Sequence, residues 1–129
     1  MTENRLLWVL QVALGVQFVA VGILHFIVPE GLPATLEWMY DLSDTLHAIS
    51  GIAEILGGLG LILPAATKIL PQLTVAAAAG LVLVMVGAVV YHIGRGEIFN
   101  VVGNLILAAL LAYVAYGRWQ REPIRTAHP

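Results

Sequence analysis

Four long apolar stretches constrain this chain more than any other feature of its sequence. They cover residues 6–28, 45–63, 72–93 and 98–116. Each is close to the ~20 apolar residues that a helix needs to cross a hydrocarbon layer ~30 Å thick. Backbone polar groups in lipid must be satisfied within the chain, and the stretches lack the alternating pattern of barrel strands, so we expect helices. The sequence predicts an all-α integral membrane protein, a single four-transmembrane-helix bundle over residues 1–129 with a tail over residues 117–129.

The composition supports a lipid environment and excludes several functional classes. The chain is 60% hydrophobic and only 11% charged, whereas a soluble domain carries roughly 25% charged residues. It contains no cysteine, which excludes disulfide bonds, thiolate metal sites and iron–sulfur clusters. With six basic residues and a formal net charge of -2, it cannot neutralise a run of phosphates, so we expect no nucleic-acid partner. The lipid bilayer is the partner that the composition predicts.

Charged residues between the stretches predict how the chain is oriented in the membrane. Five basic residues fall on one side of the predicted bundle: Arg5, Lys68, Arg118, Arg121 and Arg125. Arg95 falls on the other side, where the loop over residues 29–44 is acidic. Because cytoplasmic loops are enriched in Lys and Arg, we expect the N-terminus and the C-terminus in the cytoplasm and this loop outside. Trp38, Tyr40 and Tyr91 would then mark the outer membrane interface.

The outer loop contains a further candidate helix. Acidic residues recur at i, i+4 and i+7 and apolar residues line another side: Glu37, Asp41 and Asp44 against Leu36, Met39 and Tyr40. This pattern favours a short interfacial helix with its apolar side toward the lipid. Two alternatives stay open, an irregular acidic loop and a cation site, although the loop lacks the dense ligand spacing of a calcium-binding loop.

Polar side chains inside the predicted spans gather at one depth, near the outer end of the bundle. Such groups are expensive in hydrocarbon, so each is a candidate functional residue. The candidate ligand-binding residues are His25, His47, Ser50, Glu54, His92, Asn100 and Asn104. If their helix faces point inward, the bundle holds a polar pocket that opens outward. The alternative is that these groups only satisfy one another and fix the bundle.

Glu54 is the sharpest candidate, because a lone carboxylate in a membrane must be protonated or paired. A protonated His25, His47 or His92 is its natural partner, whereas a neutral Glu54 could donate a hydrogen bond to a ligand carbonyl. These histidines could also hold a metal ion or haem, but none shows the i, i+3 or i, i+4 pairing of a site on one helix. No complete catalytic constellation is visible, so we do not expect the chain to be an enzyme on its own.

Small residues and glutamines predict how the helices pack. Small residues that would let helix backbones approach closely are Gly51, Gly57, Gly58 and Gly60 in the second stretch, and residues 76–80 with Gly87 in the third. Gln11 is expected to snorkel or to bond across helices, and Gln17 to reach the floor of the pocket.

Two segments carry a resemblance to a known family. Residues 15–26 read GVQFVAVGILHF, and residues 51–61 read GIAEILGGLGL. They resemble the first two helices of the DoxX and DoxX-like family, whose second helix has a glycine, a membrane glutamate and a glycine-rich run. The positions that match this pattern are Gly51, Glu54, Gly57 and Gly58. Members commonly carry a basic residue late in the first helix, where this chain has His25.

The resemblance implies a four-helix layout and a limited set of functions. Some relatives are membrane subunits of quinone-linked oxidoreductases, others belong to complexes that handle oxidative stress, and one animal relative is a chaperone for acetylcholine receptors. We therefore expect an accessory subunit of a membrane redox system that binds an amphipathic molecule, with a quinone favoured, in the polar pocket. The alternatives are an assembly factor that recognises a client helix, and a haem- or metal-binding membrane protein. A redox partner protein or a homo-oligomer is compatible with these hypotheses.

Overall fold

Four long helices build the protein, and the computed structural model describes residues 1–127. They are α1 (Glu3–Ile27), α2 (Asp44–Thr67), α3 (Gln72–Arg95) and α4 (Ile98–Tyr116). A 3₁₀ helix, η1 (Ala34–Tyr40), connects α1 to α2, and a π-helical turn, η2 (Gly117–Arg121), follows α4. The long helices are apolar and long enough to cross a membrane. No strand occurs in the described part of the chain, which confirms the predicted all-α membrane bundle of four helices.

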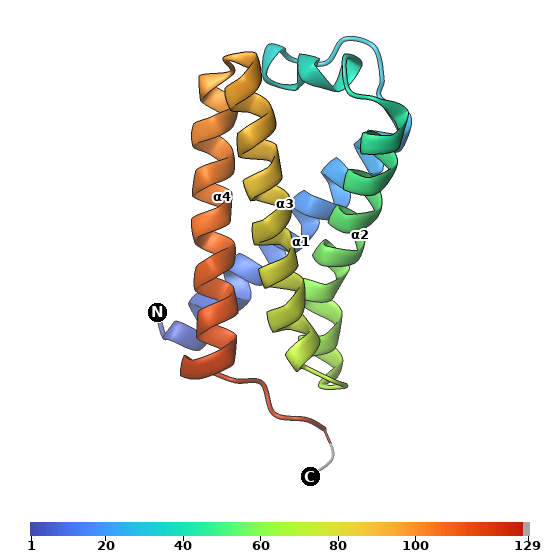
Figure 1. Cartoon of the computed structure of the whole chain (residues 1–129). Helices are drawn as coiled ribbons and strands as arrows, with labels where there is room; N and C mark the ends of the chain where they lie inside the picture. Colours follow the sequence, from blue (N-terminus) through green and yellow to red (C-terminus); the bar gives the residue numbers. More distant parts are fainter. Residues whose placement is uncertain (128–129) are drawn as a thin grey trace.

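The helices pack as two pairs (Figure 1). Helix α1 packs along α2 and α3 packs along α4, while α2 and α3 join the pairs and α1 touches α4 only sparsely. The start of α1 and the end of α4 lie at one end of the bundle, and η1 crosses the opposite end. We call these the terminal end and the loop end.

Two glycine–glycine contacts hold the α1–α2 pair together. Gly15 of α1 faces Gly58 of α2, and Gly22 faces Gly51 nearer the loop end. A Cβ atom at Gly58 would lie 2.6 Å from the carbonyl oxygen of Gly15, so the two backbones are in direct contact there. A close neighbour across a helix interface confirms the predicted packing role of Gly51, Gly57, Gly58 and Gly60. The same role predicted for Gly80 and Gly87 was wrong, because no atom of a neighbouring helix lies within 4 Å of where their Cβ atoms would be.

The apolar core fills the bundle from the terminal end to its middle. Its buried residues come from every long helix: Leu7, Leu14, Phe18, Leu61, Ala78, Leu81, Met85, Leu111 and Val114. Phe18 and Met85 lie at the upper edge of this core and also line the cavities described below. The core therefore ends where the polar residues of the loop end begin.

Helix α2 continues through Pro64, although the sequence predicted an end just before it. Proline lacks an N–H, so it cannot bond the carbonyl of Gly60, and its ring crowds that carbonyl. The hydroxyl of Thr74 in α3 donates to the Gly60 oxygen over 3.0 Å instead. The next carbonyl, that of Leu61, accepts from the side-chain amide of Gln11 over 2.8 Å. Side chains of α1 and α3 thus satisfy the carbonyls beside the proline, and Gln11 bonds across helices, one of its two predicted alternatives.

A second polar cluster, which the sequence did not predict, closes the terminal end. Arg118 in η2 is only 4% exposed, although it was expected among the cytoplasmic surface charges. Its Nε donates to Gln11 over 2.6 Å and its Nη1 donates to Asn4 over 2.8 Å. The guanidinium also lies over the ring of Trp8, 5.4 Å from its centroid. Gly117 packs directly on α1, and this close approach carries Arg118 inside the bundle.

The outer loop forms a short helix, but its apolar side faces the protein rather than lipid. Met39 is 1% exposed, and its carbonyl accepts a hydrogen bond from His47 over 2.8 Å. Trp38, predicted at the membrane interface, packs instead against His25 and His92. The predicted orientation of this short helix was wrong because the two helix pairs leave an opening at the loop end, and the side chains of Trp38 and Met39 fill it.

We predict that Gly58→Ala destabilises the bundle by about 1–3 kcal/mol, the usual cost of overpacking a tight contact. The new methyl group would meet the backbone oxygen of Gly15, which cannot move without separating α1 from α2. Gly80→Ala in α3 is the matched control; its methyl group meets no atom within 4 Å, so it should be neutral or slightly stabilising. Thermal unfolding in detergent provides the measurement, and equal midpoints for the two variants would contradict the glycine contact.

Candidate functional site

Polar side chains from α1 and α2 contact one another beneath η1. Nε2 of His25 lies 2.9 Å from Oε2 of Glu54, and Nδ1 of His25 lies 2.8 Å from Nδ1 of His47. Nε2 of His47 donates to the carbonyl oxygen of Met39 over 2.8 Å. The contacts run without a break from the backbone of η1 to the carboxyl group of Glu54. We call this set the His–Glu cluster: His25, His47 and Glu54, with the Met39 carbonyl.

The glycine contact nearest the loop end places the His–Glu cluster. Gly22 lies about one turn before His25 in α1, and Gly51 lies between His47 and Glu54 on one face of α2. Because the backbones touch at Gly22 and Gly51, side chains on either side of that contact reach across it. His25, His47 and Glu54 are all buried, so their polar atoms need partners within the protein.

Glu54 is not fully satisfied by these contacts. Its Oε2 lies at ion-pair distance from His25 but accepts no well-aligned hydrogen bond. It is the one buried side-chain polar atom of the described residues that lacks a hydrogen bond. The second oxygen, Oε1, likewise has no hydrogen bond to the described part of the chain. An unsatisfied buried polar group costs about 1–3 kcal/mol, so this carboxyl group is a candidate for contact with a bound molecule.

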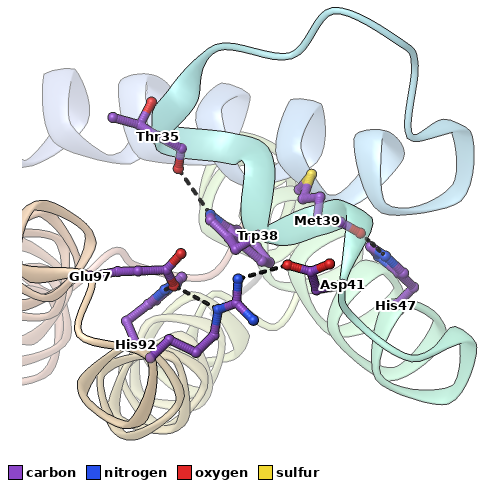
Figure 2. Close-up of polar contacts among 8 residues, drawn as sticks. Thr35, Trp38, Met39, Asp41, His47, His92 and Glu97 are labelled. Atoms are coloured by element: carbon purple, nitrogen blue, oxygen red, sulfur yellow. Dashed lines mark hydrogen bonds and ion pairs between the residues drawn. The ribbon is translucent and has the colours of Figure 1, made fainter.

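Trp38 joins the His–Glu cluster to α3. Figure 2 draws its indole ring together with His92 of α3. The centroid of its indole ring lies 5.8 Å from the His25 ring and 5.0 Å from the His92 ring. The ring N–H donates to the carbonyl of Thr35 over 3.0 Å, within η1 itself. The centroid of the Tyr91 ring lies 6.2 Å from that of the indole. Trp38 therefore lies as a wedge between the two helix pairs at the loop end.

An ionic clasp, formed by Asp41, Arg95 and Glu97, fastens η1 to the turn between α3 and α4 (Figure 2). Nη2 of Arg95 lies 2.8 Å from Oδ2 of Asp41, and its Nε lies 3.0 Å from Oε1 of Glu97. The same Glu97 oxygen lies 2.8 Å from Nδ1 of His92. Burial raises the pKa of Glu97, but the hydrogen bonds to His92 and Arg95 together lower it by more, so the pKa lies below its ordinary value. Glu97 is therefore ionised at neutral pH and holds a proton on Nδ1 of His92.

Two cavities flank Glu54. The first cavity, of about 410 Å³, is lined by all four helices and η1. The polar residues that line only this cavity are Gln17, Thr35, Asn100 and Asn104. The second, of about 280 Å³, lies mainly between α2 and α3 and is more apolar. The residues that line both are Trp38, Glu54, Met85, Ala88 and His92. Ligand pockets commonly measure roughly 300–1,000 Å³, so the first cavity alone has the size of a small-molecule site.

The structure brings the predicted site residues to one end of the bundle. His25, His47 and Glu54 are in contact, His92 lines both cavities, Asn100 and Asn104 line the first, and Ser50 lines the second. Gln17 lines the first cavity, as expected. The histidines are not gathered around one point, because His92 contacts Glu97 instead. Among the described residues, no group of three His, Asp or Glu side chains could hold a metal ion.

Sequence reasoning missed Trp38 and Glu97 as parts of the site. Trp38 was predicted at the outer membrane interface, and the periodicity of the loop did not indicate that its side chain lies between the helix pairs. Glu97 had a usable signal: Gly96 ends α3 in a left-handed conformation, with φ 72°, and a glycine after a helix commonly turns the chain back. The N–H of Glu97 bonds the carbonyl of His92 over 3.0 Å, which brings the two side chains together.

Residues 9–114, most of the chain, match the DoxX-like family. The protein belongs to the DoxX-like family. No curated protein and no solved structure matches the chain. In this DoxX-like protein, the glutamate and two glycines that carried the resemblance, Glu54, Gly51 and Gly58, all lie along the contact between α1 and α2.

We predict that Glu97→Gln lowers the stability of the DoxX-like bundle by about 1 kcal/mol near neutral pH, as expected for a partly exposed ionic network. Because folding lowers the pKa of Glu97, its contribution is present above the ordinary glutamate pKa of about 4.3. It is lost as the pH falls through the lower pKa of the folded protein. Thermal midpoints of wild type and variant should therefore converge in acid. Glu30→Gln, at an exposed loop position, is the control; a gap between wild type and Glu97→Gln that persists unchanged in strong acid would contradict the assignment.

Proposed function

We propose that this DoxX-like protein binds a small amphipathic ring molecule beside Glu54, with a quinone, in either redox state, as the favoured class. The observation that carries the proposal is the buried carboxyl group of Glu54, which lines both cavities and lacks a well-aligned hydrogen bond. A polar substituent on a bound ring would satisfy that group.

The lining of the first cavity supports a ring with polar edges. Apolar walls are supplied by Phe18, Met85 and Leu107, while Glu54 and the amide of Asn104 offer hydrogen bonds. Few, well-placed polar groups in an apolar cavity are typical of small-molecule sites. The cavity is bounded by α1 and α4, which touch each other only sparsely, and this gap favours access from the lipid.

We propose that the protein serves as an accessory subunit of a membrane redox system rather than as an enzyme by itself. The family resemblance implies quinone-linked complexes among its relatives. The chain has no cysteine for thiol or iron–sulfur redox chemistry, so electrons exchanged with a bound quinone would pass through a partner protein. His92 lies apart from His25 and His47, and the described residues include no group of three side chains that could hold a metal ion, so the haem or metal alternative has no geometric support.

A groove between α2 and α3 favours a second candidate function. It measures about 420 Å³ and is lined by small residues, among them Gly57, Gly60, Ala76, Ala77 and Gly80. Small residues let another helix approach closely in lipid, so an assembly factor that recognises a client helix would use this face. That function predicts a co-purifying protein and no retained small molecule.

The binding proposal is tested by titration with duroquinone and, under anaerobic conditions, duroquinol. Quenching of Trp38 fluorescence in a Trp8→Phe, Trp119→Phe background reports binding at the loop end, with calorimetry as a second readout. Ala88 lines both cavities. The larger side chain of Ala88→Leu would reduce the volume of each cavity and should weaken binding about tenfold or more. Ala79→Leu, at an exposed position of the same helix, is the matched control and should bind normally. Failure of both redox states to bind the wild type would overturn the proposal.

We further propose that both termini lie in the cytoplasm, so that the loop end and its site face outward. The absence of cysteine allows a direct test with single-cysteine variants. A membrane-impermeant maleimide should label Glu37→Cys in intact cells, and should label Ala127→Cys only after the cells are permeabilised. The reverse pattern would overturn this orientation.

A further inference from the structure

The contacts of the His–Glu cluster restrict where its protons can lie. The carbonyl oxygen of Met39 can only accept a hydrogen bond, so the facing Nε2 of His47 carries a proton. The remaining contacts join Nδ1 of His47 to Nδ1 of His25 at 2.8 Å, and Nε2 of His25 to Oε2 of Glu54 at 2.9 Å. Either atom of these two pairs can hold a proton or lack one.

One proton lies in each of these contacts, although the His25–Glu54 contact is a close ion pair rather than a well-aligned hydrogen bond. With none, two lone pairs would face each other at close range, and with two, a pair of proton-bearing atoms would repel. Three contacts therefore hold three protons, the number carried together by two neutral histidines and one protonated glutamate. The count is the same when His25 is an imidazolium ion beside a Glu54 carboxylate, so the cluster is neutral as a whole.

A fourth proton, on Oε1 of Glu54, would give the buried cluster a net charge of +1, which burial away from water disfavours, so Oε1 carries none. This oxygen is either the second oxygen of a carboxylate or the carbonyl oxygen of an acid whose proton faces His25. In both states it presents only lone pairs, and it has no hydrogen bond within the described part of the chain. The sequence left open a Glu54 that donates to a ligand carbonyl; the proton count assigns Oε1 the role of acceptor.

The other polar groups around the first cavity are compatible with a donor ligand. Asn100 and Asn104 carry amides that both donate and accept. Nδ1 of His92 donates to the carboxylate of Glu97, while its Nε2 accepts when the ring is neutral and donates when the ring is protonated. The hydrogen-bonding requirement on the ligand is therefore set by Oε1 of Glu54, which calls for a hydroxyl or N–H donor.

We propose, building on the proposed ligand site, that the protein selects the hydroxyl-bearing form of its ligand. The ligand class is an aromatic ring with an O–H group, a quinol rather than a quinone, whose hydroxyl donates to Oε1 of Glu54. His47 acts as a positioning residue. Because its Nε2 donates to the Met39 carbonyl, one proton lies between its Nδ1 and Nδ1 of His25, and Oε1 of Glu54 carries no proton.

Two probe pairs test this selection by calorimetry on the full-length protein in detergent. Thymol and its methyl ether share a ring and differ in the hydroxyl donor, and duroquinol and duroquinone differ in redox state. The donor member of each pair should bind about tenfold or more tightly, as expected for a hydrogen bond to a charged or strongly polarised acceptor. Equal affinities, or tighter binding of the ether and the quinone, would overturn the selection while leaving the proposed site intact. Absence of binding by all four probes would overturn the site itself.

A matched pair of variants separates proton positioning from general stability. His47→Phe keeps the size of the ring and removes its nitrogens, so His25 can shift its proton to Nε2 and Glu54 can protonate at Oε1. The affinity ratio between donor and acceptor probes should then fall toward one. Glu37→Gln, which removes an exposed carboxylate of η1, should keep the wild-type ratio. An unchanged ratio in His47→Phe would contradict the positioning role.

Nitrogen NMR of labelled histidines tests the proton count in the wild-type protein, so the result does not depend on whether a variant folds. Nε2 of His47 should be protonated, and the two facing Nδ1 atoms should share one proton. A His47 with a bare Nε2, or with a neutral His25 protonated only at Nε2 beside a neutral His47, would overturn the proton count.

Discussion

The direct contact of two helix backbones determines where the rest of this protein can lie. Because Gly22 and Gly51 bring α1 and α2 together near the loop end, His25 reaches Glu54 and His47 across the interface. The second pair of helices cannot pack equally closely on both partners, and α1 touches α4 only sparsely. The space that remains is filled by apolar side chains toward the terminal end. At the loop end it persists as the two cavities beside Glu54.

Each end of the bundle buries polar groups, but the two ends do so differently. At the terminal end Arg118 is held by Gln11 and Asn4, and its donors meet acceptors within the protein. At the loop end Glu54 keeps an oxygen without a well-aligned hydrogen bond beside open space. A fully satisfied cluster stabilises a fold, whereas an incompletely satisfied one beside a cavity favours a ligand. This contrast is the physical basis of the proposal that a ligand binds at the loop end.

The connection over the loop end shapes the chemistry as much as the helices do. Through its Met39 carbonyl, η1 sets the proton on His47, and through Trp38 it forms a wall shared by both cavities. The ionic clasp from Asp41 to Arg95 fastens this segment to the other helix pair. The same segment thus covers the cavities and orients a proton of the His–Glu cluster.

The sequence by itself determined the four membrane helices, the glycine faces and the candidate residues from His25 to Asn104, because hydrophobic length and helical periodicity are local properties. It also carried the family resemblance. Only the tertiary structure decided that Glu54 contacts His25 rather than His92, that Trp38 faces the protein, and that Arg118 is buried. It likewise showed that α2 continues through Pro64, because the side chains of Thr74 and Gln11 donate hydrogen bonds to nearby carbonyls. These outcomes depend on which helices are neighbours and on the path of a connection, and neither follows from the periodicity of a single segment.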